Sequence, residues 1–204
     1  ENIFEKMRKI AMFGGAFNPI HNGHIEMANR ISECLQLDLL LLVPTGTSPH
    51  KTTALAPNED RLCMCQMASK YIRNCVVSDI ELHRAGKSYT ADTLLELKKQ
   101  YKDDRLYLIC GADMFLTLDE WYRPDIIFEN AVICGIKRDN TSDHLMQEKK
   151  RQLEAMGAEV CILDISVPPY SSTVVRESIR KGEVADDMIK SEIEDYIKKK
   201  GLYL

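Results

Sequence analysis

The chain carries the sequence GGAFNPIHNGH at residues 14–24, directly after the apolar run Ile10–Phe13. From Ile25 onward, apolar residues recur at a spacing typical of a helix. The order of strand, glycine turn and helix lets a backbone approach a phosphate closely. The stretch therefore predicts an anion-binding turn, with His21 and His24 at the start of the helix.

Two kinds of residue give this turn its chemistry. Gly14 and Gly15 lack the side chains that would block a phosphate, and Gly23 permits close packing between the histidines. Because His21 and His24 are three residues apart, both imidazoles reach one side of a first helical turn. An isolated histidine is more often a surface or hydrogen-bonded residue, and a zinc pair would need a third ligand, for which no spacing is recognisable. The stretch matches neither the dinucleotide fingerprint nor the Walker A loop.

Short apolar runs alternate with helical patterns along most of the chain. We expect six strands, at Lys9–Gly14, Leu39–Val43, Cys75–Ile80, Leu106–Cys110, Ala131–Ile136 and Val160–Asp164. Helical spacing is found at Ile25, Ala28, Ile31 and Leu35, at Leu94, Leu97 and Tyr101, and at Ile189, Ile193 and Tyr196. Continuous Leu, Ile and Val runs suit strands covered on both faces. The pattern predicts an α/β fold, a Rossmann-like doubly wound parallel sheet with helices on both faces and a ligand site at the carboxyl ends of the strands.

The composition is that of an ordinary globular protein, with 204 residues, 45% of them hydrophobic, and a net charge of −4. We expect a single domain over residues 8–204, with 165–204 as its C-terminal helical part and 1–7 as an N-terminal extension. The acidic balance argues against general binding of nucleic acid. No apolar run reaches the length of a membrane span and no signal-peptide pattern is found, so no membrane partner is expected. The sequence leaves open whether the chain forms a homo-oligomer.

The seven cysteines include no C-x-x-C pair. This usage indicates reduced thiols and a cytoplasmic location. Cys63 and Cys65 lie two residues apart in a helical pattern and would point to different faces, so they are not expected to bind a metal together.

A second motif, Ser171-Ser172-Thr173-Val174-Val175-Arg176, follows Pro168 and Pro169. Ser171 or Ser172 can cap a helix that runs through Ile179, and a capped start offers N–H groups and a positive dipole end to an anion. Arg176, one turn in, adds a forked and permanently charged donor. A plain N-cap followed by a solvated arginine is an equally good interpretation of this segment alone.

Other candidates are weaker when taken singly. The long connection from Pro44 to Pro57 is typical of a functional loop, with a solvated surface loop as the alternative. Trp121 is the only tryptophan, and a lone tryptophan is more often a packing residue than a ligand platform. Gly111 and Asp113 follow a strand at the expected ligand edge, where Asp113 could equally be a helix N-cap.

Together, these motifs resemble a known family. Residues 14–24 and 171–176 resemble the two signatures of the nucleotidylyltransferase superfamily. Further segments are similar to patterns of bacterial nicotinate-nucleotide adenylyltransferases, namely Pro49-His50-Lys51, Ser88–Leu94, Gly111–Met114, Glu120-Trp121-Tyr122 and Gly201-Leu202-Tyr203. The resemblance covers residues 8 to 204. The chain departs from the family at Ala16, where Thr or Ser is usual, at Asn18, where Asp is common, and at Tyr170, where a smaller aliphatic residue is usual.

The resemblance implies an activity and a set of site residues. The AMP part of ATP would be joined to nicotinate mononucleotide, giving nicotinate adenine dinucleotide and pyrophosphate in NAD biosynthesis. Mg²⁺ would be held by the ATP phosphates and not by protein side chains. The implied catalytic residues are His21, His24 and Arg176. The implied ATP contacts are Gly14, Gly15, Ala16, Phe17, Asn18, Gly23, Lys51, Gly111, Asp113, Ser171, Ser172 and Thr173. The implied mononucleotide contacts are Gly15, Lys51, Thr90, Trp121 and Tyr122.

Three rival functions stay open at the level of sequence. The enzyme could prefer nicotinamide mononucleotide, or the chain could be a non-catalytic nucleotide-binding module of the same fold. Phosphopantetheine adenylyltransferases share the first motif, but their chains are usually shorter and lack a Ser-Tyr-Thr segment like residues 88–90.

Overall fold

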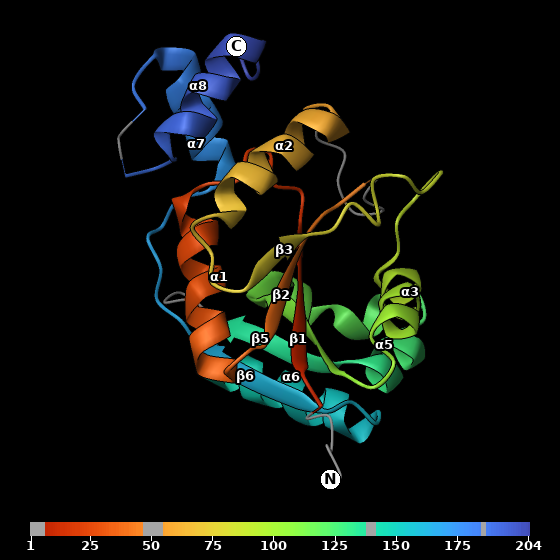
Figure 1. Ribbon diagram of the computed structural model, residues 1–204. Helices are drawn as coiled ribbons and strands as arrows, with labels where there is room; N and C mark the ends of the chain where they lie inside the picture. The colour runs from red at the N-terminus through yellow and green to blue at the C-terminus, as the bar shows by residue number, and fades with distance from the viewer. Residues whose placement is uncertain (1–6, 47–54, 138–141, 185–186) are drawn as a thin grey trace, which may run out of the picture.

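A six-stranded, all-parallel sheet forms the centre of the computed structural model, which describes residues 7–46, 55–137, 142–184 and 187–204 (Figure 1). The strand order is β3-β2-β1-β4-β5-β6. The strands are β1 (Lys9–Gly15), β2 (Leu39–Pro44), β3 (Cys75–Val77), β4 (Arg105–Gly111), β5 (Val132–Lys137) and β6 (Val160–Asp164). The order reverses between β1 and β4, so their carboxyl ends diverge into the crevice in which such sheets bind ligands.

Helices cover both faces of the sheet. They are α1 (Asn22–Leu35), α2 (Asn58–Ser69), α3 (Thr90–Gln100), α4 (Ala112–Leu116), the 3-10 turn η1 (Leu118–Glu120), α5 (Pro124–Asn130), α6 (Asp143–Ala155), α7 (Ser172–Lys181) and α8 (Ser191–Lys200). Alternate residues of β1 enter two different apolar clusters: Ala11 and Phe13 pack with α1, α2, α7 and α8, whereas Ile10 and Met12 pack with α3 to α6. The two clusters confirm the predicted doubly wound α/β fold.

The predicted strands agree with the observed ones to within one or two residues, except at β3. This strand ends at Val77 and not at Ile80. It is an edge strand that pairs only with β2, and the Ser78 N–H donates the last bond of the ladder to Leu42 O at 2.9 Å. The chain then turns, with Leu82 N–H bonded to Asp79 O. The partner strand β2 continues to Pro44, so β3 ends early because the polar residues Ser78 and Asp79 lead the chain into this turn.

The C-terminal helices α7 and α8 lie together at one end of the molecule, beside α2 (Figure 1). The Tyr196 hydroxyl of α8 donates to the Asp60 carboxylate of α2 at 2.7 Å. This contact holds the C-terminal helix α8 against α2, the helix that follows the connection after β2. The division into one domain at 8–204 stays a prediction.

The cysteines differ from expectation at one pair. Cys134 of β5 and Cys161 of β6 form a disulfide, so the prediction that all seven thiols are reduced is wrong for these two. They are register partners on neighbouring parallel strands with Cα atoms 5.0 Å apart, a proximity that sequence spacing does not reveal. Within the described ranges, no helix combines the length and apolar composition needed to cross a bilayer.

Candidate active site

The two histidines of the first motif meet at the start of α1. Their rings stack with centroids 3.7 Å apart and planes 29° apart, so both imidazoles face one side as predicted. The backbone N–H of His21 donates to the ring nitrogen Nδ1 of His24 at 3.2 Å. Since Nδ1 accepts this bond, a neutral His24 carries its proton on Nε2. His21 is buried and His24 is half-buried, so His24 offers the more accessible donor.

Phe17 and Gly23 fix the positions of these rings. Phe17 is 2% exposed, and its ring stands edge-on to His24 with centroids 5.1 Å apart. A Cβ atom at Gly23 would lie 3.0 Å from the His21 ring and 3.4 Å from Pro168 O. A larger residue at Gly23 would therefore require the His21 ring to shift by a few tenths of an ångström. The buried Phe17 ring supports His24, so any substrate contact at Phe17 falls to its backbone.

The second motif docks onto the first through residues that lie 153 and 158 positions apart in the chain. Ser172 Oγ donates to Pro19 O at 2.9 Å, and Arg176 Nη1 donates to Asn18 O at 2.8 Å. Arg176 Nη2 donates to Thr173 Oγ1 at 3.2 Å. The arginine is thus half-buried and bound, not freely solvated.

Of the two candidate caps, Ser171 is the one that caps α7, since its Oγ accepts the Val174 N–H at 3.2 Å. Ser172 is the first residue of the helix and ties it to the first motif instead. Helices α1 and α7 therefore begin side by side, and each start carries a positive dipole end.

A cavity of about 350 Å³ lies between these two helix starts, and we call it the histidine pocket. Its lining is His21, Gly23, His24, Met27, Ile165, Ser166, Val167, Pro168, Pro169, Tyr170, Ser171 and Ser172. Tyr170, one of the departures from the family pattern, belongs to this wall, and its hydroxyl is bonded to the Asp187 carboxylate. The pocket combines neutral donors and helix starts, which suits a polyanion.

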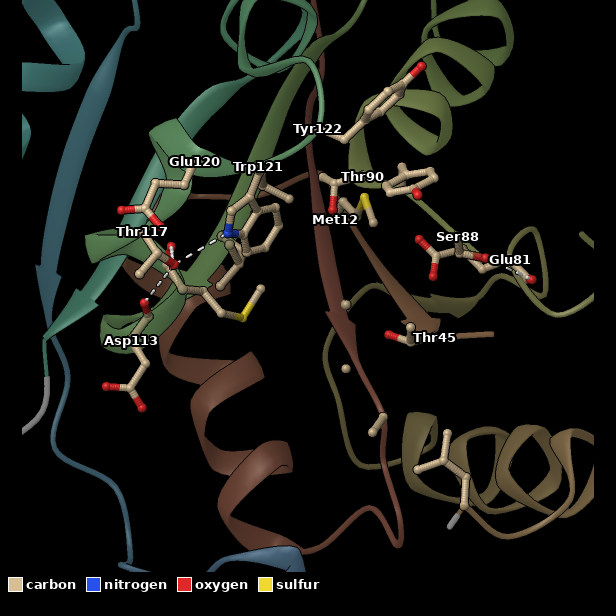
Figure 2. Close-up of a pocket in the computed structure, with 18 residues that line it drawn as sticks. Met12, Thr45, Glu81, Ser88, Thr90, Asp113, Thr117, Glu120, Trp121 and Tyr122 are labelled. Atoms are coloured by element: carbon tan, nitrogen blue, oxygen red, sulfur yellow. Dashed lines mark hydrogen bonds between the residues drawn. The ribbon is translucent and has the colours of Figure 1, made fainter. Parts of the chain in front are cut away.

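A second cavity of about 450 Å³ lies at the carboxyl ends of the strands, and we call it the aromatic pocket (Figure 2). Its lining is Met12, Gly14, Gly15, Ala16, Thr45, Leu55, Glu81, Ser88, Tyr89, Thr90, Leu108, Ile109, Asp113, Met114, Thr117, Glu120, Trp121 and Tyr122. Gly14, Gly15 and Ala16 thus join the first motif to this second cavity. The structure brings every predicted mononucleotide contact here except Lys51, which lies outside the described residues.

Trp121 forms a half-buried wall of the aromatic pocket. Its Nε1–H donates to Thr117 Oγ1 at 3.3 Å, and the Thr117 hydroxyl lies 3.2 Å from Asp113 O, to which it can donate (Figure 2). These bonds anchor one edge of the indole to α4. Tyr122 and Tyr89 pair at the other side, with ring centroids 4.5 Å apart. A flat aromatic ligand would find stacking surfaces here.

Thr90 and Asp113 each lie in the first turn of a helix that borders the aromatic pocket. Thr90 is the first residue of α3, so the positive end of that helix dipole faces the cavity wall. Gly111, which ends β4, occupies the N-cap position of α4. The N-cap interpretation of Asp113 is therefore wrong, and Asp113 is an exposed residue of the pocket lining. Gly111 itself is not part of the pocket lining.

Two buried charged residues were missed by the sequence reasoning. Glu81 is 4% exposed, and burial raises the pKa of its carboxyl although Thr93 Oγ1 donates to it at 2.8 Å. Arg84 Nη1 donates to the same threonine at 2.9 Å, which couples α3 to the segment after β3. Arg61 is fully buried in α2 and bonded to Ala16 O at 2.7 Å. Both stand in polar segments where no periodicity marks them as buried.

Two further predictions concern metal binding by protein side chains and the ATP contact at Asn18. In the described part of the chain, no group of three His, Cys, Asp or Glu residues is placed to hold a metal ion. Asn18 is 3% exposed and its Oδ1 accepts the Ala56 N–H at 3.0 Å, so this side chain fastens the end of the connection after β2.

Comparison with known proteins assigns this site to a class. A family model described as cytidylyltransferase-like matches residues 12–178, a range that includes both motifs. By fold and by motif the chain is therefore a nucleotidyltransferase. A protein of Clostridium tetani named "Probable nicotinate-nucleotide adenylyltransferase" is 36% identical over 199 residues, covering 97% of this chain and 100% of the relative. A Geobacillus thermodenitrificans protein of the same name is 34% identical over 200 residues, covering 97% of this chain and 87% of the relative. The chain belongs to the nicotinate-nucleotide adenylyltransferase family.

Solved structures agree on the fold. The nicotinic acid mononucleotide adenylyltransferase of Plasmodium falciparum, complexed with APC, has a TM-score of 0.75 at 20% identity and covers 96% of this chain and 97% of its own. The same protein complexed with NaAD also gives a TM-score of 0.75, at 19% identity. At this identity the match speaks for the fold alone.

Proposed function

We propose that this enzyme transfers the AMP part of ATP to nicotinate mononucleotide and releases pyrophosphate, as a step of NAD biosynthesis. One observation carries the proposal: the histidine pocket and the aromatic pocket share the turn at residues 14–24, so a polyanion and a flat ring would meet across it. Membership of the family, at 36% identity over 97% of the chain, supports the choice of substrates.

The reaction that we propose is an in-line displacement at the α-phosphorus of ATP. The 5′-phosphate oxygen of the mononucleotide forms the new bond, and the bond to the β-phosphate oxygen breaks as pyrophosphate leaves. A phosphate monoester has a second pKa of about 6, so the nucleophile is already ionised at neutral pH. No general base is required, and catalysis rests on positioning and on charge stabilisation. Mg²⁺ enters with the ATP phosphates as part of this proposal.

In this scheme the histidine pocket holds the phosphates. The Nε2–H of His24 donates to a phosphoryl oxygen, because Nδ1 of this ring already accepts the backbone N–H of His21. Arg176, bound by one nitrogen to Asn18 O, supplies positive charge beside the two helix starts. These groups stabilise the charge that develops on the phosphoryl oxygens in the transition state.

The aromatic pocket selects the mononucleotide. The pyridine ring stacks on Trp121, and the Thr90 hydroxyl donates to the nicotinate carboxylate near the positive end of α3. A carboxylate that lost water without gaining donors would be costly to bind. The amide of nicotinamide carries its own donor and mismatches a site built from donors.

Nicotinamide mononucleotide is the rival substrate, and one observation favours it. The described residues that line the aromatic pocket include the acidic Glu81, Asp113 and Glu120 but no Lys, Arg or His. Acidic walls accept hydrogen bonds from an amide, whereas they repel a carboxylate.

A panel of both mononucleotides with ATP, followed by pyrophosphate release, decides between these substrates. We expect the acid to give the larger kcat/KM. A larger value for the amide would reverse the assignment. Tight binding of ATP with no pyrophosphate release from either compound would indicate a non-catalytic module. A cytoplasmic location stays a prediction.

A further inference from the structure

Arg61 is an unusual residue because its guanidinium is fully buried and, within the described part of the chain, is bound to neutral groups only. Its Nη1 donates to Ala16 O at 2.7 Å, its Nη2 to Asn58 Oδ1 at 2.6 Å and its Nε to Ala56 O at 3.2 Å. Among the residues that the structure describes, no carboxylate forms an ion pair with it. None of these described neighbours therefore cancels its positive charge.

The bond to Ala16 is one of several that tie the carbonyl oxygens of the glycine turn to the surrounding elements. Gly15 O accepts the Thr45 N–H at 2.8 Å, and Pro19 O accepts the Ser172 hydroxyl at 2.9 Å. In a planar trans peptide the N–H points opposite to the C=O. Fixing the Gly15 and Ala16 carbonyls therefore directs the N–H groups of Ala16 and Phe17 away from β2 and α2. An anion beside this turn meets N–H groups instead of carbonyl oxygens.

The positive charge of Arg61 also favours an anion beside the turn. A buried ion lowers stability unless something compensates for it, and here the hydrogen-bond acceptors are dipoles only. The field of the guanidinium reaches the turn at residues 14–24 through protein of low polarity, where water screens it weakly. A substrate phosphate at the turn would be the missing opposite charge.

We propose that Arg61 is a positioning residue, which holds the Ala16 carbonyl away from the phosphates of ATP and provides positive potential behind the turn. This inference rests on the proposed function, since it concerns the same ATP site. Arg61 is fully buried and acts through Ala16 without touching the substrate. The departure at Ala16, which removes a side-chain hydroxyl, makes the orientation of this peptide more important for any phosphate contact.

Four variants test this role. Arg61→Met keeps an unbranched, apolar stem and removes both the charge and the donors, whereas Arg61→Lys keeps the charge and loses the fork. Asn58→Ala removes the acceptor of Nη2 and a longer bond that the same amide donates to Leu82 O at 3.4 Å. Arg73→Met is the matched control, because Arg73 is an exposed arginine. ATP affinity is measured by calorimetry without mononucleotide. Mononucleotide affinity is measured from the fluorescence of Trp121, the only tryptophan, which lines the aromatic pocket.

We expect Arg61→Met to weaken ATP binding about 10- to 100-fold, the range seen when residues that orient metal ligands from outside the first shell are removed. Arg61→Lys should recover part of this loss, and Arg73→Met should match the wild type. Mononucleotide binding should change less than the ATP affinity in Arg61→Met, whereas a general loss of structure would weaken both.

Unchanged ATP affinity in a folded Arg61→Met protein would overturn the inference, as would equal losses at both pockets. If Arg61→Met does not fold, Asn58→Ala decides: weaker ATP binding supports the role, and unchanged ATP binding overturns it. The proposed function fails separately, if the wild type binds ATP yet releases no pyrophosphate with either mononucleotide.

Discussion

The histidine pocket and the aromatic pocket are built in different ways. The histidine pocket is made mainly from the two motifs and the segment just before the second, and its polar parts are imidazoles, hydroxyls and helix starts. The aromatic pocket collects residues from the ends of β1 and β2, from the start of α3 and from the segment around η1. Phosphate chemistry needs a few donors in fixed positions, whereas ring recognition needs surfaces that several elements can supply.

This difference assigns a different kinetic signature to each pocket. Losing a donor at the histidine pocket should lower turnover, because such a donor binds the transition state more strongly than the ground state. Losing a surface at the aromatic pocket should raise KM for the mononucleotide, because stacking on the ring is the same in both states. The first three predictions below test this contrast, beginning with the largest expected effect, and the fourth tests the burial of Glu81 in the wall of the aromatic pocket.

His24→Ala should have the largest effect. Removal of one donor to a developing negative charge costs about 10²- to 10³-fold in turnover. We expect kcat for pyrophosphate release to fall by this factor while KM for the mononucleotide stays close to the wild-type value. His83→Ala is the matched control, since His83 is exposed and its ring is bonded to the Asp79 carboxylate on the same surface segment. Almost unchanged turnover in His24→Ala would show that the histidine pocket does not act on the transition state through this donor.

Trp121→Ala should act on binding and much less on turnover. Stacking of a base on an aromatic side chain contributes about 1–3 kcal/mol, so KM for the mononucleotide should rise about tenfold or more. Trp121→Phe keeps a ring at the position and should recover most of the affinity. A fall in kcat with no change in KM would show that the aromatic pocket takes part in the chemistry as well.

Thr90→Val replaces the proposed carboxylate donor with a side chain of nearly the same shape. A hydrogen bond to a charged group contributes about 1.5–3 kcal/mol, and the start of α3 still remains. We therefore expect the preference for the acid over the amide to fall about fivefold to tenfold, measured as the ratio of the two kcat/KM values. Thr90→Ser, which keeps the hydroxyl, should preserve the ratio. An unchanged ratio in Thr90→Val would mean that a group other than Thr90 recognises the carboxylate of the acid.

Glu81→Gln should alter the pH dependence of stability. Burial raises the pKa of Glu81 above its ordinary value of 4.5, so between these two values the folded chain binds more protons than the unfolded chain. The free energy of unfolding of the wild type then carries a contribution that falls as pH rises through this window, by at most about 1.4 kcal/mol per pH unit. Glutamine does not titrate and removes this contribution.

Urea unfolding of both proteins between pH 4.5 and pH 7 measures this effect. The difference between the wild type and Glu81→Gln cancels the other titrating groups. A difference that stays constant across this range, or that grows in favour of the wild type as pH rises, would contradict the raised pKa of Glu81.

The comparison also explains which site residues a sequence can reveal. His21, His24 and Ser171 were found because contiguous motifs fix them, and the structure places all three in one pocket. Arg61 was missed because its partners Ala16 and Ala56 belong to other segments and its own helix has no strong polar pattern. Glu81 was missed for the same reason, since it is buried only when α3 and the end of β2 pack around it.

The sequence by itself determined the doubly wound sheet, five of the six strands to within one or two residues, and the two helix starts that carry the motifs. It did so because apolar periodicity, caps and glycines are local signals that act over a few residues. Tertiary structure alone decided that Arg176 and Ser172 close on the carbonyls of Asn18 and Pro19, that Cys134 lies beside Cys161, and that Arg61 and Glu81 are buried. These features depend on contacts between distant segments, whose register and burial exist only once the sheet has formed.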